Sequence, residues 1–518
     1  MGKIRILWTD DEIEVLKPHI IFLTERGYDV YTCTNGIDTI DLVAENTYDI
    51  IFLDEHMPGL SGIDTLREIK LIKPLIPVVM ITKSEAEEIM EAAIGSQIAD
   101  FLIKPVKPQQ ILLSLKKNID RSRLVTETTT SNYQAEFGKI RSLIASAQSH
   151  QDWINIYRKI IYWDTRLDNA DDNNLKEVFE MQEQEANSEF ARFVSKNYLN
   201  WLKPECSDPP LLSQVIIKEK VLPLLKEKKK VMFILLDNLR YDQWKIIEGE
   251  LNEHLKVLSD EVYYSILPTA TQYSRNAIFA GLMPGEINDM MPEYWVHDDE
   301  EGGKNLYERE LLEAQLKRAS IKCKWDYFKI SNNNAGKKVN DKLSDILKND
   351  LNVLVYNFID MLSHARTEIG LIRDLADNES AYRSLTRSWF IHSPLFELFK
   401  KLRGQDIKIF ITTDHGTIRV NNPLKVVGDR HSSSNIRYKL GRNLDYPGNK
   451  VFEIPKPADA HLPKTNISSR YIFALAYDYF LYPKNYNHFA NYYRNTFQHG
   501  GISMHEMMIP IISLKPSD

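Results

Sequence analysis

The first 120 residues alternate short apolar runs with amphipathic stretches. The apolar runs are too short for helices and are typical of strands that are buried on both faces. The stretches between them have the spacing of helices. This alternation predicts a parallel sheet with helices on both faces. We expect strands at 4–8, 28–32, 49–53, 77–81 and 100–103.

The next segment has a different pattern. From residue 109 to 203 the chain contains no proline and one glycine. Because proline breaks helix interiors, this predicts long helices, and the apolar positions of 175–202 follow a period near 3.6. We expect a link at 126–130, a turn at 168–174 and about three helices. Since they carry no recognisable chemistry, we interpret them as a packing spacer.

After the break at 203–210 (KPECSDPP), the strand and helix alternation returns. Three strands are expected, at 231–236, 353–358 and 407–412. Each is followed by an aspartate, and these are Asp237, Asp360 and Asp414. In open α/β sheets, ligands bind at the carboxyl ends of the strands, so three acids at such ends predict a site.

The length of 518 residues suits three to four domains at about 150 residues each. Hydrophobic residues make up 43% and charged residues 26%, as in ordinary globular proteins. We therefore expect an α/β multidomain protein with an all-α helical middle segment. The expected domains are 1–120, 121–205 and 206–518.

Charge and cysteine content narrow the functional classes. The net charge is −7, which disfavours a protein that grips duplex DNA over a broad face. No apolar run is long enough for membrane insertion, and no signal peptide is recognisable. The three scattered cysteines form neither a disulfide framework nor a cysteine-based zinc site. These features predict a cytoplasmic protein.

Polar residues gather where the N-terminal strands end. Asp10 and Asp11 follow the first strand, Asp54 ends the third, and Thr82 and Lys104 end the fourth and fifth. Carboxylates without a nearby histidine suit a hard cation such as Mg²⁺. A carboxylate can also attack a phosphoryl donor, and a lysine and a hydroxyl can stabilise the phosphate that results.

This ordered set resembles the receiver domain of two-component response regulators, which has a flavodoxin-like fold. The alternative is a flavodoxin-like domain with incidental acids. The resemblance implies that Asp54 is the phosphoacceptor. The implied Mg²⁺ ligands are Asp10, Asp11, Asp54 and the backbone carbonyl of His56. The implied switch residues are Thr82, Phe101 and Lys104.

A second set of polar residues lies in the C-terminal part. Asp360 and His364 are four residues apart and share one face of a predicted helix. The other members are Asp237, Thr271, Asp414, His415 and His499. Mixed imidazole and carboxylate ligands favour zinc over Mg²⁺. Seven groups are too many for one tetrahedral ion, so we expect two Zn ions.

The motifs PTAT, GLMP and HGGISMHEMMIP resemble those of the alkaline phosphatase superfamily. The resemblance implies that Thr271 is the catalytic nucleophile. One implied zinc site is Asp360, His364 and His499, and the other is Asp237, Thr271, Asp414 and His415. Candidates for holding substrate phosphate are Tyr273, Arg275, Asn276, His431 and Arg437. Helix caps and loop hydrogen bonds are an equal alternative for these five.

The whole chain resembles response regulators with a PglZ domain that are associated with type IX secretion in Bacteroidetes. This implies a sensor histidine kinase partner, a homodimer on phosphorylation, and phosphodiesterase action on cyclic or linear oligonucleotides. The alternative is an adaptor whose non-catalytic metal domain binds a transcription (sigma) factor or a secretion component. Because a structural metal site needs no nucleophile, Thr271 favours the enzyme. A DNA-binding regulator is disfavoured because the C-terminus lacks a helix-turn-helix pattern.

Overall fold

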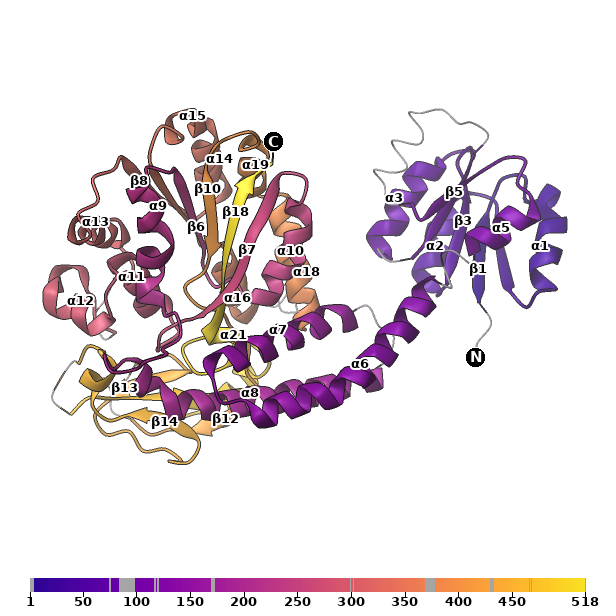
Figure 1. Cartoon of the computed structure of the whole chain (residues 1–518). Helices are drawn as coiled ribbons and strands as arrows, with labels where there is room; N and C mark the ends of the chain where they lie inside the picture. The colour runs from indigo at the N-terminus through magenta and orange to yellow at the C-terminus, as the bar shows by residue number, and fades with distance from the viewer. Residues whose placement is uncertain are drawn as a thin grey trace. The chain divides into compact units, whose positions relative to one another are not determined.

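The chain forms two compact units, Met1–Gln134 and Ala135–Asp518, in a computed structural model (Figure 1). The backbone alone is described at 121–131, 173–174 and 364–368. The described residues are 4–73, 76–82, 98–115, 118, 121–168, 173–298, 300, 302–368, 378–428, 433–464, 466 and 468–517.

The first unit is the expected parallel sheet. Its described strands lie in the order β2-β1-β3-β4-β5, and each starts within one residue of its predicted position. They are β1 (Arg5–Thr9), β2 (Asp29–Cys33), β3 (Ile50–Asp54), β4 (Val78–Thr82) and β5 (Asp100–Ile103). The helices are α1 (Lys17–Thr24), α2 (Gly36–Glu45), α3 (Gly62–Ile72) and α5 (Pro108–Leu115), with a 3₁₀ turn at Ile13–Leu16.

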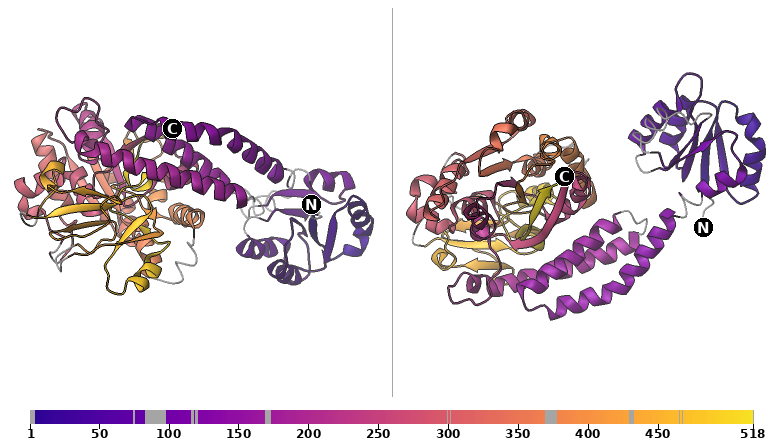
Figure 2. Two further views of the ribbon diagram at one scale, coloured as in Figure 1. Left: turned by 90° about the horizontal axis from the view of Figure 1, so that it is seen from below. Right: turned by 45° about the horizontal axis from the view of Figure 1, so that its top comes forward.

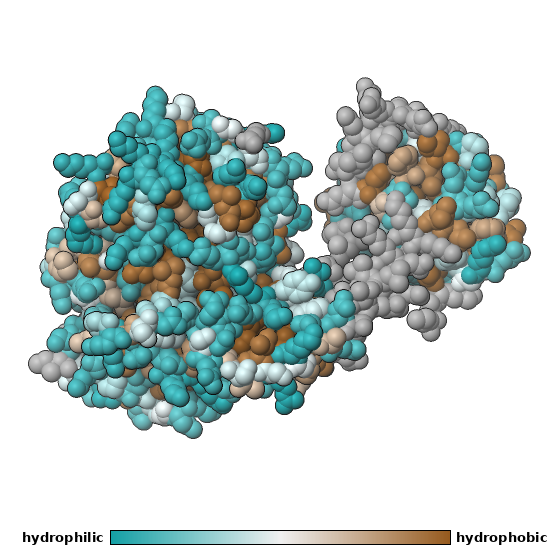
Figure 3. Space-filling model, viewed as in Figure 1, coloured by the Kyte–Doolittle hydropathy of each residue, from teal (hydrophilic) through white to brown (hydrophobic). Residues whose placement is uncertain are grey.

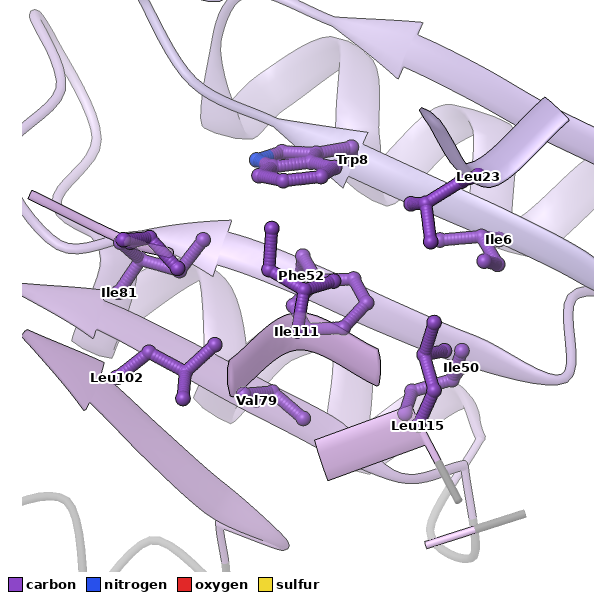
Figure 4. Packing of buried hydrophobic residues seen from close by; sticks show 11 residues of the cluster. Ile6, Trp8, Leu23, Ile50, Phe52, Val79, Ile81, Leu102, Ile111 and Leu115 are labelled. Carbon is purple, nitrogen blue, oxygen red and sulfur yellow. The ribbon is translucent and has the colours of Figure 1, made fainter. Parts of the chain in front are cut away.

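Each face of this sheet packs a separate hydrophobic core. Successive side chains of a strand point to opposite faces, so Ile6 and Trp8 join one core and Leu7 joins the other. The rings of Trp8 and Phe52 lie 5.2 Å apart in the first core (Figure 4). Because both faces are covered, the strands are almost entirely apolar, and their polar residues are confined to the ends.

The second unit is built on a mixed sheet. Its described strands lie in the order β7-β18-β10-β6-β9-β8, with β18 antiparallel to both neighbours and the last four strands parallel. Predicted and observed bounds agree for β6 and differ by one or two residues for β9 and β10. The strands are β6 (Val231–Leu236), β7 (Leu255–Tyr264), β8 (Trp325–Ile330), β9 (Leu351–Tyr356), β10 (Lys408–Thr412) and β18 (Met508–Pro516).

A lobe of short strands follows β10 and carries colours from orange to yellow in Figure 1. The hydrophobic pattern predicted none of these strands. One sheet has the order β13-β15-β14, and β12–β16 and β11–β17 form separate pairs. Their bounds are β11 (Ile418–Arg419), β12 (Asn422–Lys425), β13 (Tyr438–Gly441), β14 (Val451–Ile454), β15 (Arg470–Ala474), β16 (Asp478–Leu481) and β17 (Phe497–Gln498), and α20 (Tyr486–Tyr493) precedes β17.

Three long helices occupy the middle of the chain, as predicted. They are α6 (Arg121–Ser146), α7 (His150–Leu167) and α8 (Asn173–Trp201). The expected link at 126–130 is wrong, because α6 continues through it; threonine costs a helix only a fraction of a kcal/mol, roughly 0.7 or less per residue. The expected turn at 168–174 includes 169–172, which lie outside the described residues. α7 and α8 run side by side (Figure 2).

Helices α7 and α8 pack against the C-terminal part within the second unit. The rings of Trp153 and Phe190 lie 5.5 Å apart, and Tyr157 Oη lies 3.1 Å from His505 Nδ1. Arg383 is buried and pairs with Asp168 at 2.6 Å. The helical segment therefore shares one compact unit with the C-terminal sheet.

The remaining described helices surround the two sheets of the second unit. They are α9 (Leu222–Lys226), α10 (Tyr241–Leu251), α11 (Thr271–Ala280), α12 (Pro284–Met290), α13 (Glu308–Arg318), α14 (Asn333–Asp341), α15 (Leu343–Ile346), α16 (Phe358–Glu368), α18 (Glu379–Ile391), α19 (Pro394–Lys401) and α21 (Met504–Met507). On the face in Figure 3, hydrophilic residues predominate and hydrophobic residues form separate patches. Within the described part of the chain, every helix is too short or too polar to span a bilayer.

Candidate functional site

The predicted acids of the first unit meet at the carboxyl ends of β1 and β3. Oxygen atoms of Asp10, Asp11 and Asp54 all lie within 4.8 Å of one another. Lys104, just after β5, places its Nζ 2.8 Å from Asp10 Oδ2 and 2.9 Å from Asp54 Oδ1. The structure thus brings together four residues from three segments that are far apart in the sequence.

Asp54 is buried at the end of β3. Burial raises the pKa of its carboxyl, the hydrogen bond from Lys104 opposes that shift, and the Asp10 carboxylate adds to it. Asp54 Oδ2 is buried and accepts no hydrogen bond from the described residues. An oxygen without a partner, among carboxylates alone, fits a hard cation such as Mg²⁺.

The predicted switch residues flank this pocket. Thr82 Oγ1 donates a hydrogen bond of 2.7 Å to Glu55 Oε2. The Phe101 side chain is 37% exposed. The His56 imidazole is also exposed, with Nδ1 3.3 Å from Glu55 Oε2. We did not predict Glu55, although it directly follows Asp54, the predicted phosphoacceptor.

The second site lies at the carboxyl ends of β6 and β10. Asp237 follows β6, and Asp414 and His415 follow β10. Donor atoms of these three buried residues all lie within 4.8 Å of one another. Asp237 Oδ1 is buried and accepts no hydrogen bond from the described residues. Two carboxylates and one imidazole fit a zinc ion.

Two backbone carbonyls orient the imidazoles of the site. His415 Nδ1 lies 3.2 Å from the Gly416 carbonyl oxygen, and His499 Nδ1 lies 3.1 Å from that of Thr269. A carbonyl can only accept, so both Nδ1 atoms donate and both Nε2 atoms keep their lone pairs. Burial lowers the pKa of His415 to about 4, which keeps the ring neutral. A neutral imidazole with one nitrogen fixed by a hydrogen bond is the form that binds metals.

The Thr271 hydroxyl lies beside His415 of the first predicted metal group. Thr271 is the first residue of α11, and its Oγ1 lies 3.0 Å from His415 Nε2. The His415 and His499 rings stack at 4.2 Å, and His499 Nε2 lies 3.9 Å from Asp360 Oδ1. Asp360 is in the first turn of α16. The backbone of His364 belongs to α16, but its side chain lies outside the described residues.

Asn238 connects the two groups, and we did not predict it from the sequence. Its backbone N–H donates to Asp414 Oδ1 at 3.3 Å, and its Nδ2 donates to Asp360 Oδ1 at 3.3 Å. Its φ of +67° is in the left-handed region, which asparagine tolerates better than most residues. The position directly after a strand-end aspartate is the signal that could have identified it.

Arg275 neutralises the carboxylates of the first group. It is buried in α11, pairs with Asp237, and places Nε 2.9 Å from Asp414 Oδ2. Its Nη1 lies 3.3 Å from Glu308 Oε1. Burial raises the pKa of Asp414, but Arg275, His415 and the hydrogen bonds together outweigh burial and lower the pKa to about 2. Burial also raises the pKa of Asp237, and there the pairing with Arg275 opposes the shift without reversing it. Arg275 therefore holds both carboxyl groups in place and favours the ionised form of each.

The other candidates for holding phosphate have partners within the fold. Tyr273 Oη donates to Asp298 at 3.2 Å, and the Asn276 side chain donates to the Lys304 carbonyl at 3.3 Å. Arg437 is buried and pairs with Glu506. His431 lies outside the described residues. Phosphate binding by this set stays a prediction.

A pocket of about 380 Å³ borders the metal groups. It contains His499 and Gln272, the residue after Thr271. None of the described phosphate candidates lines it. Its other lining residues are Asp298, Lys304, Ser433, Ser434, Asn435, Ile436, Tyr438, Tyr492, Tyr493 and Gln498.

Three family models match the chain, each over a different part. Residues 6–116 match the response regulator receiver domain, and residues 123–202 match the PorX response regulator linker domain. Residues 216–514, more than half of the chain, match the BREX system PglZ alkaline phosphatase-like domain. This order of domains is that of the PorX architecture.

Two regulatory proteins and a solved structure are similar to about a quarter of the chain. The transcriptional regulatory protein ZraR of Klebsiella oxytoca is 31% identical over 138 residues, which is 27% of this chain and 31% of ZraR. The alginate biosynthesis transcriptional regulatory protein AlgB of Pseudomonas syringae is 29% identical over 146 residues, 28% of this chain and 32% of AlgB. The chain thus spans about a third of the length of these relatives. A receiver domain structure from Clostridium thermocellum is 31% identical, covering 23% of this chain and 98% of that one, with a TM-score of 0.23.

Proposed function

This chain belongs to the PglZ family of alkaline phosphatase-like domains, and from that premise we propose that it is a metal-dependent phosphodiesterase controlled by phosphorylation of Asp54. The proposed metals are two zinc ions in the second unit and one Mg²⁺ in the receiver. The proposed substrates are cyclic or linear oligonucleotides, and the proposed setting is type IX secretion. A sensor histidine kinase would supply the phosphoryl group.

The position of Thr271 carries this proposal. A site with a purely structural metal has no use for a hydroxyl that lies 3.0 Å from a predicted ligand imidazole. Thr271 also begins the ten-residue helix α11. Because a helix N-terminus favours anions, a phosphate would be stabilised where the nucleophile stands.

In the proposed reaction, different residues of the chain would perform different steps. A divalent ion held by Asp237, Asp414 and His415 would lower the pKa of the Thr271 hydroxyl and neutralise charge on the phosphate. Thr271 Oγ1 would lose its proton to solvent and attack phosphorus, and the bond from phosphorus to the leaving ester oxygen would break, which leaves the rest of the substrate as a nucleotidyl-threonine diester. Water would then attack phosphorus and release the Thr271 hydroxyl. Asp360 and His499 would hold the second ion, which would stabilise the leaving oxygen.

The receiver would act through its switch residues. A phosphate on Asp54 offers oxygens that the Thr82 hydroxyl can reach in place of Glu55, and the half-exposed Phe101 can then turn inward. The surface expected to change, about residues 84–118, includes 84–97, 116 and 117, which lie outside the described residues. We expect a homodimer to form through this surface, and light scattering with and without acetyl phosphate would test it.

A substrate panel would test the proposed activity. Zinc-loaded protein is given a nitrophenyl phosphate monoester, bis(p-nitrophenyl) phosphate and a cyclic dinucleotide, with chelated protein as the control. We expect the diester and the cyclic dinucleotide to be hydrolysed only by the zinc-loaded protein. Hydrolysis of none of the three would contradict the enzyme and favour the adaptor.

A further inference from the structure

A second, larger cavity adjoins the pocket that contains His499. It has a volume of about 820 Å³ and lies in the lobe of short strands, between β13, β16 and α20. Ser434, Ile436 and Tyr493 line both cavities, so the two spaces share a wall. A molecule bound at the metal groups could therefore extend into the larger cavity.

Aromatic side chains dominate the larger cavity. Phe480 and Tyr482 come from β16 and the residue that follows it, and Phe489 and Tyr493 come from α20. Phe489 is 37% exposed, although a large apolar ring on a soluble surface is usually covered. Aromatic faces at the edge of a phosphodiester site are the surfaces on which nucleic-acid bases stack.

One buried cation lies in the same cavity. Lys439 of β13 is 1% exposed, and its Nζ donates to the Ser433 carbonyl at 2.9 Å and lies 4.3 Å from the centre of the Tyr482 ring. Among the described residues it has no carboxylate partner. An ammonium has three hydrogens to donate, so this one is incompletely satisfied. Burial lowers its pKa to about 7.

A buried charge without a counter-ion is costly unless a ligand completes it. The described surroundings of Lys439 offer the Ser433 carbonyl and the Tyr482 ring, and both favour the charged form of the amine. Among the described residues no carboxylate pairs with it, and a bound anion would complete its contacts. The cavity therefore combines an apolar aromatic wall with a place for one negative charge, next to a site for a phosphodiester.

We propose that this cavity binds the second nucleotide of the substrate, with its base against Phe489 and Tyr493 and a non-scissile phosphate at Lys439. This inference rests on the proposed function and adds to it a preference for substrates with at least two nucleotides. A small diester without a second phosphate would occupy the metal groups and leave the Lys439 position unused.

Lys439→Met tests the inference. Methionine has a similar length, and replacing a buried charge by an apolar side chain is often neutral for folding or stabilising. We expect the ratio of KM for the 5′-phosphorylated dinucleotide pApA to KM for bis(p-nitrophenyl) phosphate to rise about tenfold, because a charge-assisted hydrogen bond is lost. Lys425→Met is the matched control, because Lys425 is exposed on β12 and does not line the cavity; its ratio should equal that of the wild type.

Phe489→Ala provides a second variant at the exposed edge of the cavity. Loss of one stacking surface should raise the same ratio at least fivefold, since stacking of a base contributes a roughly five- to hundredfold effect. Thermal unfolding would confirm that both variants fold. An unchanged ratio in both variants would overturn the inference, whereas the panel above decides the proposed function.

Direct measurement of ligand binding tests the inference even if the protein hydrolyses no substrate. Calorimetric titration of pApA into zinc-loaded Thr271→Ala protein, with and without Lys439→Met, measures Kd in the absence of cleavage. We expect Lys439→Met to weaken binding of pApA about tenfold and binding of inorganic phosphate by less than twofold. Equal weakening of both ligands, or of neither, would contradict a separate phosphate position.

Discussion

The two carboxylate clusters of this chain occupy equivalent places on parallel sheets but balance their charge differently. In the receiver, Asp10 and Asp54 share Lys104, whose side chain is 15% exposed, and Asp11 is open to solvent. In the second unit, Asp237 and Asp414 share the fully buried Arg275. One cluster thus reaches solvent through Asp11 and Lys104, and the other is enclosed.

This difference shows that the position of a carboxylate cluster on its sheet does not determine the chemistry of the cluster. Both clusters use the carboxyl ends of strands, where side chains of different strands converge. The receiver offers oxygen ligands alone, whereas the second cluster adds imidazoles whose tautomers are fixed by backbone carbonyls. We therefore expect transient phosphorylation at the first cluster and permanently bound metal ions at the second.

The largest expected effect is on phosphorylation of the receiver. Asp54→Asn should abolish modification by acetyl phosphate and Mg²⁺, because the amide cannot act as the nucleophile. Intact mass spectrometry measures the modification. Asp41→Asn, at an exposed position of α2, should be modified like the wild type. If Asp54→Asn were modified as much as the wild type, Asp54 would not be the residue that is phosphorylated.

The second cluster should depend as strongly on Thr271. Thr271→Ala should lower kcat for bis(p-nitrophenyl) phosphate by about a thousandfold or more, because the nucleophile acts as a unit with its neighbours. Zinc content should be largely retained, since Asp237, Asp414 and His415 remain. Thr271→Ser should keep part of the activity. A zinc-loaded Thr271→Ala protein with the wild-type rate would refute the covalent mechanism.

Removal of Arg275 should show how much the enclosed cluster depends on its buried cation. Arg275→Met leaves the buried Asp237 and Asp414 without their cation, whereas Glu308 keeps Lys329 at 2.9 Å, and this should lower the free energy of unfolding of the metal-free protein by about 3–5 kcal/mol. Zinc should recover part of this loss. Denaturant unfolding measures both.

The matched control for Arg275 is Arg309, whose exposed side chain pairs with Asp326 at 2.8 Å. Arg309→Met should change the free energy of unfolding by about 1 kcal/mol at most, as for other surface ion pairs. Equal losses in both variants would mean that burial of the charge does not matter, and the contrast between the two clusters would fail.

Metal addition should separate the two units. Zinc at about a hundred times its Kd should stabilise the second unit by roughly 2.7 kcal/mol, because binding to the folded state alone shifts the equilibrium by mass action. The unfolding transition of the receiver should not respond to zinc. Calorimetry with and without chelator measures the two transitions, and a zinc shift in the receiver alone would reverse the assignment.

The smallest expected effect concerns the stability of the receiver without Mg²⁺. Because the pKa of Asp54 is raised in the folded receiver, ionisation of this carboxyl lowers the free energy of unfolding. This loss of stability is absent at low pH, where the carboxyl is protonated, and grows as the pH rises through the raised pKa. Asp54→Asn should therefore raise the free energy of unfolding at pH 7, by up to about 1 kcal/mol after screening by solvent. A decrease in the free energy of unfolding would mean that the contact of Asp54 with Lys104 outweighs burial and the repulsion between Asp54 and Asp10.

The sequence by itself determined the five receiver strands, the strands β6, β9 and β10 of the second sheet, and the acids at their ends; β7, β8 and β18 were not predicted. Hydrophobic runs and the residues that end them are local properties, so the five receiver strands and β6 lie within a residue of their predicted positions. The types of the residues also indicated oxygen ligands for the receiver and mixed ligands for the second cluster. The short strands of the C-terminal lobe were not predicted, because they are too short to show a period in their hydrophobic residues.

Only the tertiary structure decided how distant residues pair. Arg275 appeared to be a residue for substrate phosphate until the fold placed it against Asp237 and Asp414. Likewise, nothing local in the sequence connects Thr82 with Glu55, or leaves Lys439 buried without a carboxylate. These pairings depend on which strands become neighbours, and that depends on the packing of the whole core rather than on any local pattern.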